Sequence, residues 1–86
     1  MNQTTFELKR KATHISPCLN IGKSGITDPL VDELRKQLKR NRLVKVKILK
    51  TAIDEMDRND IAKEISMRTG SLLVEVKGNS AVLYLK

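Results

Sequence analysis

The spacing of apolar residues along the chain predicts three helices. Residues 4–15 mix apolar side chains with cations until a proline ends any helix there. Residues 29–41 place leucine and valine at helical spacing and leave charged side chains on the opposite side, which is typical of an amphipathic helix. A third helix can start at Asp57 or Asn59 and stops at Gly70, after a polar connection.

Patterns typical of strands fill the intervals between these helices. The predicted strand segments are residues 18–21, 43–49, 72–77 and 81–85. In the second segment β-branched residues alternate with Lys45 and Lys47, so that one face is apolar and the other basic. Gly78 and Asn79 supply turn residues for a hairpin between the last two segments.

The order of these elements, α-β-α-β-α-β-β, sets the fold class. Strands that alternate with helices imply parallel, right-handed crossovers, and the last two strands add an antiparallel hairpin. The chain has 86 residues, which make one small domain over residues 1–86 with a single core and little room for an enzyme cleft. We therefore expect an α/β fold in which three helices cover a four-stranded mixed sheet.

A loop with two glycines joins the first strand to the second helix. Its residues are Gly22, Lys23, Ser24 and Gly25. Both glycines can adopt positive φ and let another backbone approach, and the two residues between them add a cation and a hydroxyl. Thr27 or Asp28 can cap the helix and Pro29 suits its first position, so that free N–H groups and the positive dipole end lie nearby. The loop therefore favours a phosphate, although an ordinary turn is the alternative.

The loop is not a nucleotide-binding P-loop. The motif GxxxxGK[ST] needs an additional glycine at its start, and that position is occupied by Pro17. ATP hydrolysis is therefore not expected.

The charge distribution predicts a polyanionic partner. A net charge of +7 and a pI near 9.9 indicate nucleic acid or an acidic membrane surface. Residues 35–50 contain eight cations and no acid, whereas residues 54–64 are acid-rich. Solubility alone does not need positive side chains to be separated from negative ones, but contact with a phosphate backbone does. The candidate cations are Lys36, Lys39, Arg40, Arg42, Lys45 and Lys47.

Several other classes of function lack the residues that they need. Cys18 is the only cysteine, which excludes an intrachain disulfide and a cysteine zinc site, and neither it nor His14 has an evident third partner. Phe6 and Tyr84 are the only aromatic residues, too few for a base-stacking platform. The acidic residues near Asp57 are explained by helix capping and solvent. We expect no catalytic residue, metal, cofactor or small-molecule substrate.

No segment resembles a membrane span or a signal peptide. Apolar runs fall well short of the roughly 18 residues that a span needs, and residues 1–5 are polar. We expect a cytoplasmic monomer.

Four blocks of the sequence resemble blocks of one known family and follow one another in the same order as in that family. Residues 21–28, 43–47, 68–78 and 82–84 are similar to the CRM domain, also called the YhbY-like family, and the resemblance covers about residues 7–86. The resemblance implies a fold similar to the C-terminal domain of translation initiation factor three and a GxxG loop like that of KH domains. Leu85 departs from the pattern, because many members have an arginine after the tyrosine.

The resemblance also implies RNA binding. Single-domain members of the family are associated with the precursor of the large ribosomal subunit, and multi-domain plant relatives act in splicing of organellar group II introns. One domain fits the first role, so we expect a non-catalytic protein that binds ribosomal RNA or a large-subunit precursor through the GxxG loop and the adjacent cations. A protein-docking module on ribosomal or assembly proteins is the alternative.

Overall fold

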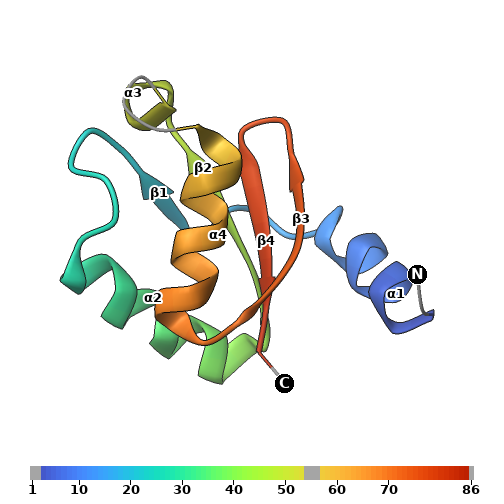
Figure 1. The fold of residues 1–86 in the computed structure, drawn as a ribbon. Coiled ribbons are helices and arrows are strands. Elements are labelled where there is room, and N and C mark those ends of the chain that lie inside the picture. Colours follow the sequence, from blue (N-terminus) through green and yellow to red (C-terminus); the bar gives the residue numbers. More distant parts are fainter. Residues whose placement is uncertain (1–2, 54–56, 86) are drawn as a thin grey trace.

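The computed structural model describes residues 3–53 and 57–85, and of residues 3–6 and 53 the backbone alone. The elements are α1 (Gln3–Ala12), β1 (Leu19–Ile21), α2 (Asp28–Asn41), β2 (Leu43–Ile48), α3 (Lys50–Ile53), α4 (Arg58–Thr69), β3 (Leu72–Lys77) and β4 (Ser80–Tyr84) (Figure 1).

The four strands form one mixed sheet in the order β1-β2-β4-β3. β1 and β2 are parallel, as expected from the helix that connects them, and β4 is antiparallel to both of its neighbours. The last strand of the chain therefore lies inside the sheet, between β2 and β3. The predicted four-stranded mixed sheet is confirmed, and the insertion of β4 decides which side chains of β2 and β3 become neighbours.

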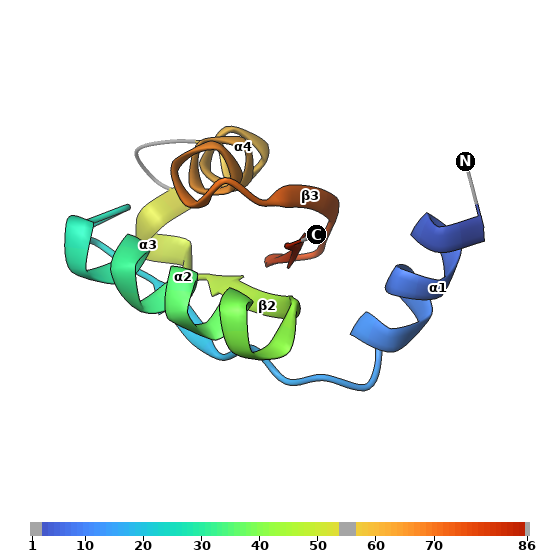
Figure 2. The ribbon, with the colours of Figure 1, turned by 90° about the horizontal axis from the view of Figure 1, so that it is seen from below.

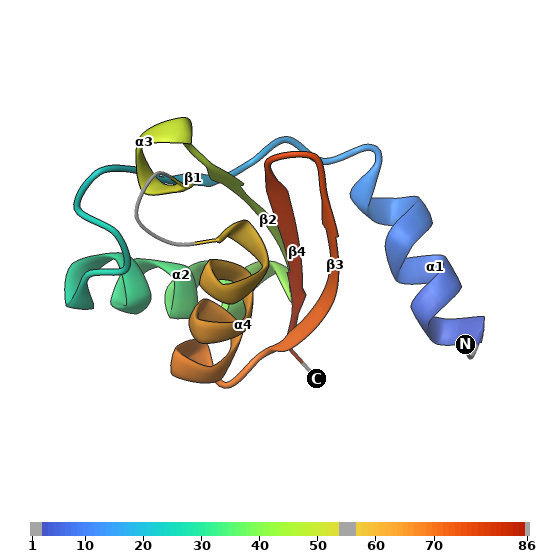
Figure 3. The same ribbon diagram turned by 45° about the horizontal axis from the view of Figure 1, so that its top comes forward.

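One face of the sheet carries the main core. The alternation predicted for β2 is present, because Val44, Val46 and Ile48 are buried on the side of α2 and α4. Figure 3 shows these two helices against the sheet. Other buried members of this core are Ile21, Leu34, Leu38, Ile61, Ala62, Ile65, Ala81 and Leu83. Complete burial of each large apolar side chain stabilises the fold by about 1.5–3 kcal/mol.

The other face of the sheet is partly covered by α1. This helix contacts β2, β3 and β4, and Figure 2 shows it on the opposite side of the strands from α2 and α4. Leu8 and Ala12 of α1 are buried, as is Val82, which alternates with the core residues Ala81 and Leu83 of β4. A second, smaller apolar contact thus holds α1 to the sheet.

The end of the first helix and a short additional helix differ from the sequence-based expectation. The first helix ends at Ala12 and not near residue 15, because the hydroxyl of Thr13 donates to the Arg10 carbonyl at 2.7 Å and the chain turns there. The expected polar connection after β2 begins with the four-residue helix α3. Its only buried apolar side chain among those described is Ala52, too little for a periodic pattern.

The ends of the other helices agree with the expected chemistry. Asp57 caps α4, because its carboxylate accepts a hydrogen bond from the Asn59 N–H at 3.0 Å. Gly70 ends the helix in the left-handed conformation, with φ of 68°.

Candidate nucleic-acid interface

The GKSG loop (Gly22–Gly25) is a tight turn between β1 and α2. The Gly25 N–H donates to the Gly22 carbonyl at 2.9 Å, and Gly25 has a φ of 71°. Gly22 has no positive φ, so only one of the two glycines uses the expected conformational freedom. Lys23 and Ser24 are exposed, and their backbone N–H groups donate to no described residue. The turn therefore offers two N–H groups, a hydroxyl and an ammonium group to an anion.

The N–H groups at the start of α2 are largely satisfied by the chain itself. Of the two capping candidates Thr27 is the N-cap, and its hydroxyl accepts a hydrogen bond from the Leu30 N–H at 3.3 Å. Pro29 has no N–H, and the Asp28 carboxylate pairs with Arg68 at 2.7 Å. Of the N–H groups expected to be free at this helix start, the N–H of Leu30 is used by the cap, whereas the N–H of Asp28 donates to no described residue. An anion at the loop must be held mainly by the turn.

The loop lies beside the segment that follows β2. The Leu49 N–H donates to the Ile21 carbonyl at 2.8 Å, and a Cβ added to Gly22 would lie 3.4 Å from Leu49 Cδ1 and 3.9 Å from Thr51 Oγ1. These contacts bring the exposed residue Lys50 to the same edge of the sheet. Ligands of α/β sheets commonly bind at the carboxyl ends of parallel strands. Lys50 is therefore a candidate that the sequence-based set omitted, although its position directly after a parallel strand could have indicated it.

Three of the candidate cations share the outer side of α2. Lys36, Lys39 and Arg40 are exposed, at helical positions opposite the buried residues of this helix. We call these three residues the helix surface. The helix has 14 residues, so it is about 21 Å long, and the last two cations lie in the turn farthest from the GKSG loop.

Arg42 lies directly after α2 and ends it. Its backbone has a positive φ of 66°, its N–H donates to the Leu38 carbonyl at 2.8 Å, and its own carbonyl accepts from the Leu85 N–H at 2.7 Å. Arg42 thus links the end of α2 to the end of β4, at the opposite end of α2 from the GKSG loop.

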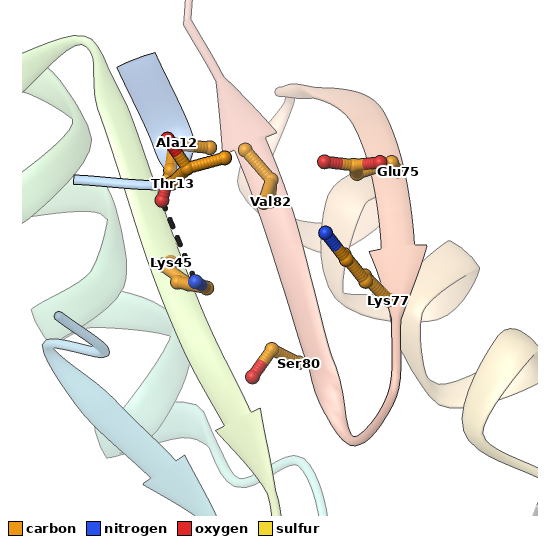
Figure 4. A pocket seen from close by; sticks show the side chains of 7 residues that line it. All are labelled: Ala12, Thr13, Lys45, Glu75, Lys77, Ser80 and Val82. Atoms are coloured by element: carbon orange, nitrogen blue, oxygen red, sulfur yellow. Dashed lines mark hydrogen bonds between the residues drawn. The ribbon is translucent and has the colours of Figure 1, made fainter. Parts of the chain in front are cut away.

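Lys45 and Lys47 face the other side of the sheet. They alternate with the buried residues of β2 and therefore point to the side of α1. Lys45 is half-buried, and its Nζ donates to the carbonyl of Ala12 at 3.4 Å (Figure 4). Because Ala12 is the last residue of α1, this ammonium group lies at the negative end of the helix dipole, where a cation is stabilising.

The six candidate cations thus do not form one surface. The sheet separates Lys45 and Lys47 from the helix surface, while only two residues, Ile26 and Thr27, join the GKSG loop to the start of α2. A single nucleic-acid segment that contacts the loop can extend along the helix surface, but it must pass around the edge of the sheet to reach Lys47.

Arginines outside the candidate set hold α2 and α4 together. Besides its pair with Asp28, Arg68 donates through Nη1 to the Ile26 carbonyl at 2.9 Å. The Arg35 guanidinium donates to the Arg68 carbonyl at 2.7 Å. These contacts fix the segment between the GKSG loop and α2.

Cys18 and Tyr84 are two further residues that the sequence singled out. Partial burial is the main cause that raises the pKa of the exposed Cys18 thiol above its ordinary value, and the carboxylate of Glu33 raises it further. Tyr84 is half-buried at the end of β4, as expected of a strand residue. The side chain of Phe6 lies outside the described part of the chain, as do Asp54 and Glu55.

Residues 3–53 and 57–85 contain no group of three or more histidine, cysteine or acidic side chains that could hold a metal ion. In the same part of the chain, no helix is both long and apolar enough to cross a membrane.

The fold and the loop together define a small α/β domain that presents a GxxG turn at the carboxyl edge of two parallel strands. The model of the CRS1 / YhbY (CRM) domain family matches residues 2–84, so the chain belongs to this family. The resemblance seen in the sequence is confirmed.

Several relatives of the chain have names that describe them as RNA-binding proteins. The "Probable RNA-binding protein YqeI" of Bacillus subtilis is 35% identical over 77 residues, which cover 90% of this chain and 78% of the relative. An "RNA-binding protein" of Haemophilus influenzae is 30% identical over 77 residues, with 90% and 76% covered. The solution structure of the protein SAV1595 from Staphylococcus aureus has a TM-score of 0.80 and 32% identity, over 95% of this chain and 83% of that one.

Proposed function

We propose that this protein is a non-catalytic RNA-binding domain whose GKSG loop binds a backbone phosphate. The observation that carries the proposal is that the backbone N–H groups of the exposed residues Lys23 and Ser24 donate to no described residue, at a turn that also bears an ammonium group and a hydroxyl. Backbone N–H groups in such turns are favourable anion ligands. The names of the relatives support RNA as the source of the phosphate.

We further propose ribosomal RNA, or a precursor of the large ribosomal subunit, as the target of a monomeric cytoplasmic protein. Family resemblance supports this choice of RNA.

The affinity should be mostly electrostatic. If the loop and the helix surface together neutralise about four phosphates, the logarithm of the binding constant should fall with the logarithm of salt concentration with a slope of about −2.8 to −3.6. Few groups at these positions can read base edges, so an isolated domain should discriminate only modestly between structured RNAs. An affinity that does not change with salt would contradict this mechanism.

A matched pair of variants tests the loop. Lys23→Asp/Ser24→Asp places two carboxylates where the phosphate would bind, and Lys63→Asp/Ser16→Asp makes the same change of charge at exposed positions away from the loop. Binding to a fragment of large-subunit ribosomal RNA is measured across a salt series, after circular dichroism has shown that both variants are folded. The loop variant should lose about tenfold or more in affinity, which is roughly 1.4 kcal/mol. Equal affinities of the two variants would refute a phosphate site in the loop.

Protein docking remains the second candidate because two large apolar side chains are exposed. Met67 of α4 is 80% exposed and Leu72 of β3 is 47% exposed. Nuclease treatment of ribosomal particles separates the two functions. Release of the protein by nuclease supports RNA binding, whereas a binary complex with a ribosomal or assembly protein that survives digestion supports docking.

A further inference from the structure

Two exposed lysines flank a serine on the sheet face that α2 and α4 leave uncovered. Lys47 of β2 lies directly opposite Ser80 of β4, and Ser80 lies directly opposite Lys77 of β3. Opposed residues of antiparallel strands point to the same face with their Cβ atoms about 4.5–5.5 Å apart. The three side chains therefore form one row across the sheet, which we call the sheet row, with a hydroxyl between two ammonium groups.

The sheet row borders a depression in the protein surface. Ser80 and Lys77 line it together with Val82, Glu75, Lys45 and the end of α1, as Figure 4 shows. Its volume is about 190 Å³. This is several times the roughly 30 Å³ that one water molecule occupies in the liquid, so a phosphate group with bound water has room there.

The charges around the depression favour an anion on the row itself. Lys47 and Lys77 are exposed and form no ion pair or hydrogen bond with any described residue. Lys45, in contrast, donates to the end of α1 and is held at the wall of the depression. Glu75 lies one row further along, opposite Val82. Its carboxylate repels an anion from that part of the depression and leaves the position over Ser80 as the favourable one.

We propose that the sheet row binds a second backbone phosphate of the RNA, on the opposite side of the sheet from the helix surface. This inference rests on the proposed function, because RNA is the source of the phosphate. Two ammonium groups and a hydroxyl contact the same phosphate group, and an RNA that also reaches the GKSG loop passes around the β1 edge of the sheet. Lys77, which lies outside the set found from the sequence, becomes a ligand of the RNA.

Pairs of variants with equal charge test the sheet row. Lys47→Gln/Lys77→Gln removes both ammonium groups and keeps most of each side-chain stem, and Lys11→Gln/Lys63→Gln removes the same charge at other exposed positions. Binding to the ribosomal RNA fragment is measured across a salt series. The sheet variant should bind about tenfold more weakly at low salt, and the control variant less than about threefold.

The salt slope reports how many phosphates are lost. Because both lysines contact one phosphate, the plot of log K against log salt concentration should be less steep in the sheet variant, by about 0.7–0.9 in slope. Lys47→Arg/Lys77→Arg keeps the charges and should restore the slope. Glu75→Gln removes the repulsive carboxylate and should raise the affinity about twofold to threefold, the opposite sign from the lysine variants.

The outcomes separate this inference from the proposed function. If the sheet and control variants lose affinity equally while the loop variant still loses more, RNA binding stands and the sheet row is not a phosphate site. If the unmodified protein does not bind the RNA, the proposed function itself is refuted. Binding to polyglutamate, an acidic polypeptide without phosphate, is measured as well. If the sheet variant loses as much affinity for polyglutamate as for RNA, the row recognises acidic protein segments and the assignment to phosphate is overturned.

Discussion

The two glycines of the GKSG loop should respond in opposite ways to alanine. Gly25 has a φ of 71° and open space around the position of a Cβ, so Gly25→Ala meets no steric contact and only the backbone cost remains. The left-handed conformation costs a non-glycine residue about 1–2 kcal/mol. The reduced entropy of the unfolded chain returns about 0.4–1 kcal/mol. The net loss of stability should be about 1 kcal/mol.

Gly22 differs from Gly25 in both respects. Its φ lies outside the left-handed region, and an added Cβ would touch the side chains of Leu49 and Thr51 at ordinary van der Waals distances of 3.4 and 3.9 Å. Gly22→Ala therefore adds no strain and should gain about 0.5 kcal/mol through the unfolded chain.

Urea unfolding measures this difference. For a small domain with a slope of about 1 kcal/mol per molar urea, Gly25→Ala should lower the midpoint by about 1 M and Gly22→Ala should raise it by about 0.5 M. Gly25→Asn is the control, because asparagine tolerates the left-handed conformation and should retain most of the stability. The reasoning fails if Gly22→Ala destabilises the protein as much as Gly25→Ala does.

Three further predictions follow from the packing and the charges. Arg68→Ala loses both the ion pair with Asp28 and the hydrogen bond to the Ile26 carbonyl, so it should lower the free energy of unfolding by about 1–2 kcal/mol. Asp28→Ala loses only the exposed ion pair and should cost under about 1 kcal/mol. Equal losses of the two variants in urea unfolding would contradict this order. Ile65→Ala, at a completely buried position of α4, should cost about 2–5 kcal/mol by the same measurement, and a loss under about 1 kcal/mol would mean that the core closes around the cavity. Because the pKa of the Cys18 thiol is raised, its alkylation by iodoacetamide should accelerate at higher pH than that of a free cysteine peptide. A plot of alkylation rate against pH whose midpoint lies at or below that of the peptide would contradict the raised pKa.

The elements of the fold could be predicted because their signals are local. The alternation of valine and lysine in β2 fixes which side chains share a face, whatever the strand pairs with. The ends of α4 were predictable for the same reason, since Gly70 and Asp57 act on backbone groups within a few residues of themselves. The four residues of α3 were missed because a single turn has no measurable period.

The candidate site was predictable as a set of residues but not as an arrangement. The sequence identified the GKSG loop and the run of cations between residues 35 and 50. It could not show that Arg68 pairs with Asp28 at the start of α2, because the two residues lie 40 positions apart along the chain. Nor could it show that Lys45 is held by the end of α1.

The sequence by itself determined the order of the elements other than α3, the candidate residues for the helix caps, the turn residues and the family. These follow from side-chain periodicity and from backbone chemistry within a few residues. Only the tertiary structure decided that β4 lies between β2 and β3, which makes Lys47 and Lys77 neighbours of Ser80, and that the sheet separates them from the helix surface. The pairing order of strands depends on contacts between distant segments, and the pattern within each strand is the same for every order in which the strands could pair.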